Sequence, residues 1–241
     1  MEGGPVKEMF VALLGKPFGI VLFQLLEATQ FTIYLSLVAF LGGGLIGLAV
    51  TAARVSPLRY LRRIFTVYTW LFQSVPLLML LFLLGLGVPH LFSVSVDPWY
   101  AAGVALTLYT SAYLSEVWRG AITAVPTGQH EGGKALGLTF PQIMVLIILP
   151  QAFRLAIAPT VGFMVQIIKG TSLAYIIGFH DLMTVGKRWA NSPVPGTQPF
   201  VIYPIMAMIY FSLCFPLSLW SRRLEERLGS TTSRGGAAAA A

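Results

Sequence analysis

Charged residues are scarce in this chain. Only 10% of its 241 residues are Asp, Glu, Lys or Arg, whereas soluble domains average about 25%. Hydrophobic residues make up 56%, and several uncharged runs reach the roughly 20 residues that cross a bilayer core. This composition excludes an ordinary soluble domain. It predicts an all-α integral membrane protein with about five transmembrane helices.

Cysteine is almost absent. Cys214 is the single cysteine and lies in an apolar run, so the chain can form neither an internal disulfide nor a multi-cysteine zinc site. We expect its side chain to pack as an apolar group. His90, His130 and His180 are dispersed without ligand spacing, which predicts no metal site. No pattern brings a nucleophile, a base and an orienting group together, so we expect no catalytic residues.

A phosphate-binding loop of the form GxxxxGK[ST] is also missing. Gly15-Lys16 is followed by proline, and Gly186-Lys187 is followed by arginine. We therefore expect the chain to hold no cofactor and not to hydrolyse ATP by itself. Any ATPase would be a separate chain.

The uncharged runs predict five membrane-spanning helices. A glycine cluster in the first of them, at 42–44 and Gly47, predicts a face that packs closely against another helix. The five predicted spans are about Thr29–Ala53, Thr66–Val88, Trp99–Val117, Gln142–Ile168 and Phe200–Trp220.

The predicted domain organisation has three parts. Residues 1–28 are expected to form an interfacial lead-in, because the apolar run Phe10–Leu26 is interrupted by Lys16 and Pro17 and no small-residue cleavage site follows. Residues 29–221 are expected to form the transmembrane domain, and residues 222–241 are expected to form a tail. The end of that tail, SRGGAAAAA, is typical of an artificial extension and carries no weight as fold evidence.

Basic residues are distributed unevenly between the two sides. Ten lie in the loops after the first and third spans and in the tail, and five lie on the other side. Cytoplasmic loops carry the excess of Lys and Arg, so the N-terminus is predicted outside and the C-terminus in the cytoplasm. The +7 net charge records this topology and does not indicate nucleic-acid binding. The ten are Arg54, Arg59, Arg62, Arg63, Arg119, Lys134, Arg222, Arg223, Arg227 and Arg234, and the five are Lys7, Lys16, Lys169, Lys187 and Arg188.

The stretch between the third and fourth spans predicts a short helix, a bend and a new helix. Gln129–Leu136 is long enough for two helical turns, and Gly137 suits the left-handed position just past a helix end. Thr139 and Gln142 have the spacing of a capping box, with Pro141 tolerated in the first turn of the new helix.

Two glycines inside this short helix need compensation. Gly132 and Gly133 each cost about 1 kcal/mol against alanine in a helix. Glycine lets backbones approach closely, so a close contact with another protein would offset that cost.

The same stretch resembles a known family. The matching pattern is Glu131-Gly132-Gly133, three residues, Gly137, nine residues, Ile147, one residue and then Leu149-Pro150. It resembles the EAA loop of importer-type ABC transporter permeases, with Gly-Gly in place of Ala-Ala. Three segments are similar to the polar-amino-acid branch: YLSEVWRGAITAVPTGQHEGGKALGLTFPQIMVLIILPQAFRLAIAP, KGTSLAYIIG and LRRIFTVYTWLFQSVPLL. The resemblance covers roughly residues 20–228. Gln73 and Gly170 depart from that branch, which commonly has Arg at the first position and an acidic or amide residue at the second.

This resemblance implies a coupling loop at about 125–142 that seats in a groove on an ATPase. It implies partners as well: ABC ATPase subunits that hold ATP and Mg, a second permease subunit, an extracytoplasmic amino-acid-binding protein and the lipid of a bacterial inner membrane, with no nucleic acid. The residues implied in coupling are Gln129, Glu131, Gly132, Gly133, Lys134, Ala135 and Gly137.

Polar residues in and beside the spans are candidates for a translocation pathway. Arg154 would cost roughly 3 kcal/mol inside a span, so it should face a partner or water, as a pathway residue or as a structural anchor. Lys169 either lines the pathway or snorkels to the interface. Glu116 pairs with Arg119 one turn away or contacts substrate. The full candidate set is Gln73, Ser74, Glu116, Arg154, Lys169 and Ser172.

An ion-coupled carrier without an ATPase is the alternative function. Such carriers often show internal repeats and buried acids. The chain shows no repeat, and Glu116 is the one acid placed inside a predicted span.

Overall fold

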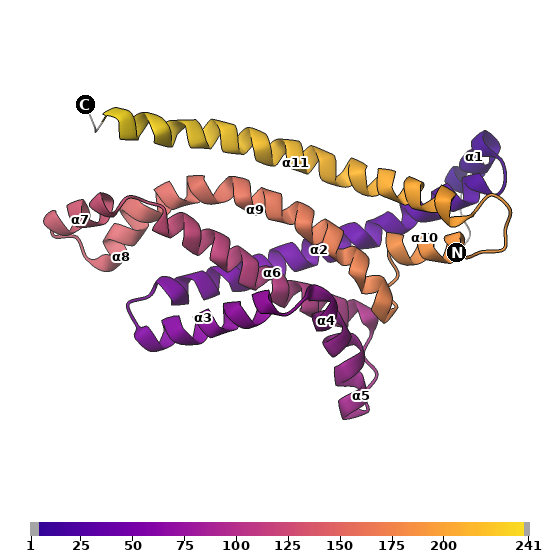
Figure 1. Cartoon of the computed structure of the whole chain (residues 1–241), viewed down its shortest axis with the longest axis horizontal. Coiled ribbons are helices and arrows are strands. Elements are labelled where there is room, and N and C mark those ends of the chain that lie inside the picture. The colour runs from indigo at the N-terminus through magenta and orange to yellow at the C-terminus, as the bar shows by residue number, and fades with distance from the viewer. Residues whose placement is uncertain (1–4, 239–241) are drawn as a thin grey trace. The chain divides into compact units, whose positions relative to one another are not determined.

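All regular elements in the described range are helices (Figure 1). The computed structural model describes residues 5–238, with side-chain surroundings for residues 6–228, so residues 239–241 of the predicted tail and the side chain of Arg234 lie outside it. The helices are α1 Pro5–Leu14, α2 Phe18–Val55, α3 Arg59–Ser74, α4 Leu77–Phe82, α5 Val88–Phe92, α6 Pro98–Thr123, α7 Thr127–Ala135, α8 Phe140–Ile143, α9 Leu149–Thr171, α10 Leu182–Ala190 and α11 Pro199–Ala238. Two π-helical segments, η1 Leu83–Gly87 and η2 Met144–Ile148, and one 3₁₀ segment, η3 Ser172–Ile177, adjoin them.

Within residues 5–238, three helical stretches are long and apolar enough to cross a membrane. They are Phe18–Val55, Phe140–Ile177 and Pro199–Leu228, with a mean hydropathy of 2.2, 1.8 and 2.0 in their most apolar windows. These stretches contain the first, fourth and fifth predicted spans. The first predicted span begins at Thr29, but the helix that contains it begins at Phe18 and continues without a break.

The second predicted span, Thr66–Val88, is wrong as a continuous helix. Helix α3 ends at Ser74, Val75 has an extended backbone with φ −90° and ψ 126°, and α4 begins after Pro76. Proline has no N–H to donate and disfavours helical geometry at the residue before it, so the helix stops there. Arg59–Ser74 and Leu77–Phe92 reach the length and apolarity of a span only when they are taken together.

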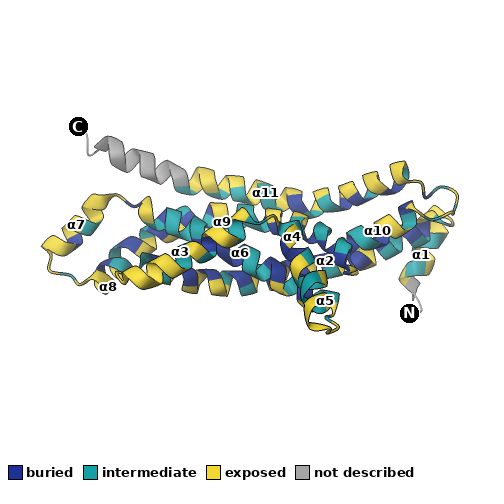
Figure 2. Ribbon diagram, turned by 60° about the horizontal axis from the view of Figure 1, so that its bottom comes forward, coloured by how far each residue is buried: buried dark blue, intermediate teal, exposed yellow. Residues whose placement is uncertain are grey.

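The third predicted span lies in a helix, α6, that is not among the three apolar stretches. Small and hydroxyl-bearing side chains fill much of α6, and many of them are buried (Figure 2). A helix surrounded by protein rather than lipid does not need high hydropathy. The buried residues of α6 include Ala101, Ala102, Ala105, Thr110, Ser111, Ala112 and Ser115. Counting the broken pair as one, the described residues hold four apolar spans at most.

The chain divides into two compact units. Unit 1 consists of Met1–Phe40, Pro76–Thr107 and Ile167–Phe215, and unit 2 consists of Leu41–Val75, Leu108–Gln166 and Pro216–Ala241. Each unit therefore contains one part of α2, α6, α9 and α11.

Unit 1 has a core between the first part of α2, α10 and α11. Leu25, Leu182 and Ile202 are fully buried in it. The sequence did not lead us to expect α10, which is amphipathic and begins after Asp181, whose side chain accepts the Thr184 N–H at 2.9 Å. Helices α10 and α11 approach closely at Gly186, where an added Cβ would overlap Sδ of Met206.

Unit 2 joins the last part of α2 to α6 through a glycine contact. A Cβ added at Gly47 would lie 3.1 Å from the Ser111 carbonyl oxygen, which confirms the predicted close-packing face of the first span. The Thr51 hydroxyl donates to the Gly47 carbonyl at 2.7 Å within the same helix. A second apolar cluster connects α6 with the segments that follow α7, with Ile143 at 1% exposure near its centre.

Candidate functional site

The short helix predicted between the third and fourth spans is present as α7. It ends in the manner that Gly137 predicted: the Gly137 N–H donates to the Lys134 carbonyl at 2.9 Å and the Leu138 N–H to the Gly133 carbonyl at 3.1 Å. These two bonds form a Schellman motif, which needs a left-handed residue after the helix end. Gly137 supplies it with φ +75°.

The helix that follows starts as its sequence predicted. Both halves of the Thr139/Gln142 capping box are present, and the Thr139 N–H donates to Oε1 of Gln142 at 2.8 Å. Pro141 lies in the first turn, where its missing N–H has no intrahelical partner to lose. The bend between α7 and α8 is therefore fixed at both ends by hydrogen bonds.

The two glycines of α7 have different surroundings. Gly133 is buried, and an added Cβ would lie 2.8 Å from Cγ1 of Ile143 and 3.2 Å from Cδ1 of Ile147. Its close approach is therefore made within the chain, which corrects our expectation that a partner protein receives it. Gly132 is exposed, and a Cβ added there would have no neighbouring atom within 4 Å.

The other residues implied in coupling form an exposed face on and just after α7 (Figure 2). Leu136, just after the helix, is 78% exposed. One side-chain contact ties this face to a following helix, α9: Nε2 of Gln151 donates to Oε1 of Gln129 at 3.2 Å. The exposed set is Gln129, Glu131, Gly132, Lys134, Ala135 and Gly137.

Helix α8 continues into the π segment η2, which ends directly before Leu149-Pro150. A proline inside a helix removes one hydrogen bond and crowds the preceding turn, and a wider π turn relieves that crowding. The segment η1 has the same placement, because it ends directly before Val88-Pro89. The Ile147-x-Leu149-Pro150 part of the motif therefore shapes the surface on which Gly133 packs.

An ion network joins the end of α2 to α6 in unit 2. Glu116 pairs with Arg119 on its own helix, as its spacing predicted. It also pairs with Arg54, whose Nη1 lies 2.6 Å from Oε2 of Glu116. This partner was not predicted from the sequence, although an arginine that closes a long apolar run is a visible signal. The Arg54 side chain is only 6% exposed, so the ion pair compensates a buried positive charge.

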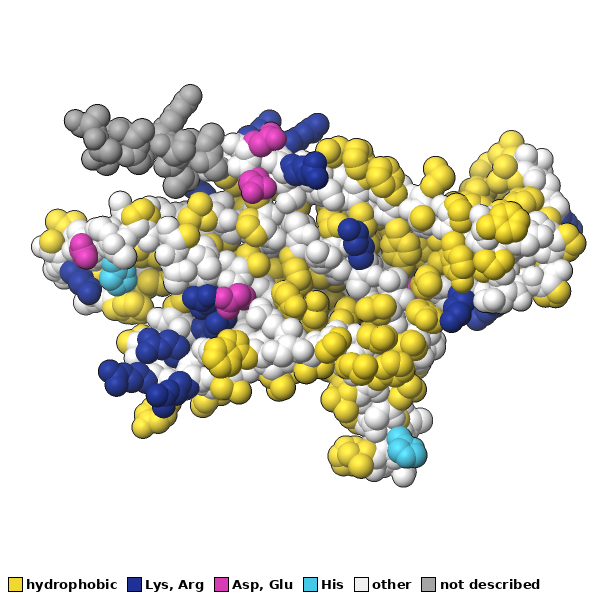
Figure 3. Space-filling view, viewed as in Figure 1, with side chains coloured by type: hydrophobic (Ala, Val, Ile, Leu, Met, Phe, Trp, Pro, Cys, Tyr) yellow, Lys and Arg dark blue, Asp and Glu magenta, His cyan; other side chains and the backbone are white. Residues whose placement is uncertain are grey.

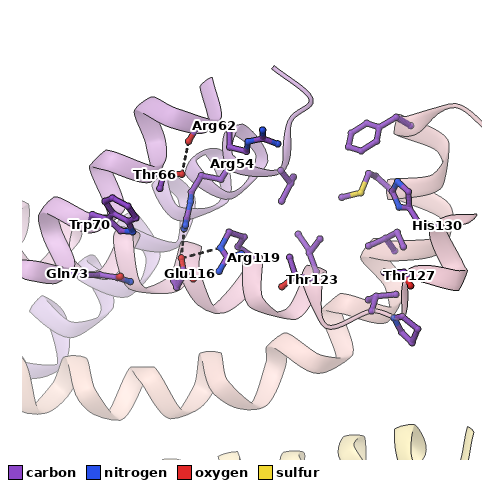
Figure 4. Close-up of a pocket in the computed structure, with 17 residues that line it drawn as sticks. Arg54, Arg62, Thr66, Trp70, Gln73, Glu116, Arg119, Thr123, Thr127 and His130 are labelled. Carbon is purple, nitrogen blue, oxygen red and sulfur yellow. Dashed lines mark hydrogen bonds and ion pairs between the residues drawn. The ribbon is translucent and has the colours of Figure 1, made fainter. Parts of the chain in front are cut away.

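A pocket of about 780 Å³ opens beside this network (Figure 4). We call it the arginine pocket, because Arg54, Arg62 and Arg119 line it while Glu116 is the one acid in its wall. Figure 3 shows Lys and Arg side chains gathered over the first part of α3, from which Arg62 comes. The remaining lining residues are Val55, Thr66, Trp70, Gln73, Ile122, Thr123, Val125, Pro126, Thr127, His130, Phe140, Met144 and Ile148.

The structure brings together only some of the predicted pathway residues. Gln73 and Glu116 both line the arginine pocket, and Nε2 of Gln73 lies 3.5 Å from the Ala112 carbonyl oxygen. Ser74 is the exposed last residue of α3. Arg154 is exposed on α9, and within the described residues no hydrogen bond or ion pair holds its side chain.

Lys169 and Ser172 belong to unit 1, whereas the other four candidates belong to unit 2. Lys169 is exposed, and its carbonyl accepts from Oγ of Ser172 at 2.6 Å. Among the residues that the structure describes, no group of three His, Cys, Asp or Glu side chains could hold a metal ion.

Comparison with known proteins gives a consistent match over most of the chain. The family described as the binding-protein-dependent transport system inner membrane component matches residues 43–230. The L-cystine transport system permease protein TcyB of Bacillus subtilis (strain 168) is 37% identical over 198 residues, which cover 82% of this chain and 83% of that protein. The probable glutamine ABC transporter permease protein GlnM of the same strain is 32% identical, with 82% and 89% coverage.

Solved structures share the fold. A chain from the crystal structure of an amino acid ABC transporter with histidines superposes with a TM-score of 0.78 at 26% identity, covering 85% of this chain and 94% of that one. A chain of the MetNI methionine ABC transporter, in an inward-facing conformation, gives a TM-score of 0.70 at 20% identity, with 86% and 96% coverage. At that identity the second likeness concerns the fold alone.

Proposed function

Because the chain belongs to the family of binding-protein-dependent transport system inner membrane components, we propose that it is the permease subunit of an ATP-driven importer for a polar amino acid. Its relatives carry names that include L-cystine, glutamine and arginine transport, which supports this substrate class. The observation that carries the proposal is α7, an exposed short helix at the position where the EAA-type spacing places a coupling helix.

The proposed assembly contains separate ATPase chains that hold ATP and Mg, a second permease subunit that completes the pathway, and an extracytoplasmic amino-acid-binding protein. The chain would cross a bacterial inner membrane several times, with its N-terminus outside and α7 in the cytoplasm. The excess of basic residues beside α7 and in the tail supports this orientation. A cysteine at Ser95 should react with impermeant thiol reagent from outside and one at Gln129 should not; the reverse pattern would contradict the orientation.

Force on α7 has a defined route to the helices that follow it in unit 2. The Schellman motif fixes the end of α7, the capping box fixes the start of α8, and Gly133 packs directly against Ile143 and Ile147. Well-packed segments transmit displacement because they are close to incompressible. Closure of the ATPases on ATP would therefore move α7 and η2 together and expose the pathway alternately to the two sides.

The roles of the pathway residues are part of the same proposal. Both carboxylate oxygens of Glu116 already bind arginines, so a structural role is favoured over substrate contact. Arg154 and Lys169 are exposed cations that would receive a substrate carboxylate, and Gln73, Ser74 and Ser172 are the polar residues proposed with them. Replacing Arg154 or Lys169 by Met should abolish uptake with assembly intact, and wild-type uptake in both variants would make these cations structural.

The coupling role of α7 can be tested at Gly132. The side chain of Gly132→Trp has open space in the isolated chain, so it should leave the thermal stability of the permease unchanged. It should obstruct docking of the ATPase, and we expect a loss of about tenfold or more in binding-protein-stimulated ATPase activity of the reconstituted transporter, since about 1.4 kcal/mol of lost docking energy is enough for that factor. Gly120→Trp is the matched control, because Gly120 also has open space but lies on α6. Full stimulation of the Gly132→Trp transporter would contradict the coupling role.

A further inference from the structure

We propose that the arginine pocket binds the phosphate group of an anionic phospholipid. The charges in its wall are the first argument. Three guanidinium groups line the pocket and one carboxylate opposes them. Both oxygens of Glu116 are occupied, by Arg54 and Arg119, which leaves Arg62 without an acid in the pocket (Figure 4). The pocket thus retains positive charge for an anionic ligand.

The exposure of the guanidinium groups is the second argument. Arg62 is exposed and the Arg119 side chain is 33% exposed, so both can contact a ligand in the pocket. Arg54 is held in the wall by Glu116 and adds its charge there. Guanidinium groups bind phosphate through several parallel hydrogen bonds.

The apolar part of the wall favours a lipid over free phosphate. Ile122, Met144 and Ile148 line the pocket together with the arginines. Its volume of about 780 Å³ lies in the range of about 300–1,000 Å³ typical of organic ligands. Trp70 adds a 66% exposed indole, a side chain that is enriched at the headgroup level of membranes. A phosphate that carries a glycerol and acyl chains would use the charged and the apolar parts at once.

The assignment to the cytoplasmic leaflet rests on the orientation in the proposed function. Basic pockets between membrane helices on that side suit acidic lipid headgroups. Binding of lipid to the pocket, however, can be measured without ATP or transport. Its failure is therefore distinguishable from failure of the coupling role of α7.

The chain offers a matched pair of arginines for the test. Arg62 and Arg63 are neighbours on α3 and both are exposed, but only Arg62 lines the pocket. The intact transporter, in neutral detergent, is titrated with dioleoyl phosphatidylglycerol, and bound lipid is counted by native mass spectrometry. Arg62→Gln should weaken binding by about fivefold or more, and Arg63→Gln by less than about twofold, because only the first removes a guanidinium from the pocket. Dioleoyl phosphatidylcholine, whose phosphate charge is balanced, should bind more weakly than phosphatidylglycerol.

Three results would overturn the proposal. Equal weakening by Arg62→Gln and Arg63→Gln would show diffuse attraction to a basic surface. Displacement of phosphatidylglycerol by equimolar inorganic phosphate would show that the site takes a soluble anion. The third result is that lipid binds to the permease alone but not when the ATPase chains are present. That result would show that a protein occupies the pocket in the transporter.

Discussion

Glu116 in unit 2 and Asp181 in unit 1 are two acids in apolar surroundings, and they differ in their partners. Glu116 keeps two arginines as partners and remains partly exposed at the wall of the arginine pocket. Asp181 is fully buried: one oxygen accepts the Thr184 N–H, and the other has no hydrogen-bond partner among the described residues. Burial is the main cause that raises the pKa of Asp181 above its ordinary value.

The difference shows how each unit accommodates a carboxyl group. A buried charge is costly unless it is paired, and an unpaired acid becomes neutral instead. Unit 2 compensates its carboxylate with cations and so acquires a charged pocket. Unit 1 uses its carboxyl as the N-cap of α10, where it accepts one N–H and forms no ion pair among the described residues.

The largest expected effect comes from removing the carboxylate in unit 2. Glu116→Gln leaves the Arg54 side chain, 6% exposed, without its ion-pair partner. Breaking a buried pair costs about 3–5 kcal/mol, and the partial exposure of Glu116 places the expected loss of unfolding free energy at about 3 kcal/mol. Thermal unfolding of the purified permease measures this loss, with Glu131→Gln on the exposed face of α7 as control.

The double variant Arg54→Met/Glu116→Gln sharpens this result, because it removes the unpaired charge as well. It should recover part of the stability lost in Glu116→Gln. If Glu116→Gln and Glu131→Gln unfold at the same temperature, the network does not stabilise unit 2 and the contrast with Asp181 fails.

The second effect tests the packing of α7 in unit 2. Gly133→Val should lower the free energy of unfolding by about 2 kcal/mol, because overpacking against a stiff β-branched neighbour costs roughly that much. Its Cβ would lie 2.8 Å from Cγ1 of Ile143. Gly132→Val has the same change in helix propensity but open space, so it should cost less than about 1 kcal/mol. Limited proteolysis at the bend and thermal unfolding measure both. Equal costs for the two substitutions would show that Gly133 does not anchor α7.

The smallest effect concerns Asp181 and appears as a pH dependence. Because its pKa is raised in the folded state, the stability it contributes is complete below the ordinary aspartate value of about 3.9 and is lost as pH rises through the raised pKa. Asp181→Asn keeps an oxygen acceptor for the N-cap but cannot ionise. Its stability should therefore fall less than that of the wild type as the pH rises from about 4 towards neutrality.

Asp97 provides the control for that measurement. It is exposed, and its Oδ1 accepts the Trp99 N–H at 2.7 Å at the start of α6, much as Asp181 accepts an N–H at the start of α10. Asp97→Asn should leave the wild-type pH profile in place. If Asp97→Asn and Asp181→Asn reduce the pH dependence of stability equally, burial of Asp181 is not the cause of that dependence.

Local spacing predicted several features that the structure confirms. The capping box, the left-handed Gly137 and the Glu116–Arg119 pair involve residues close to one another along the chain. Such contacts follow from helix geometry alone. The break at Pro76 was also visible in the sequence, but the surrounding apolar run led to the wrong prediction of a continuous span.

The sequence by itself determined that the chain is helical and membrane-embedded, because lipid leaves backbone groups no partner outside a helix. Its spacing also determined where α7 ends and α8 begins. Only the tertiary structure decided which distant residues meet. Arg54 reaches Glu116 across 62 positions, and Gly133 receives Ile143 rather than a partner protein. Such contacts depend on how whole helices pack, and no local periodicity encodes that packing.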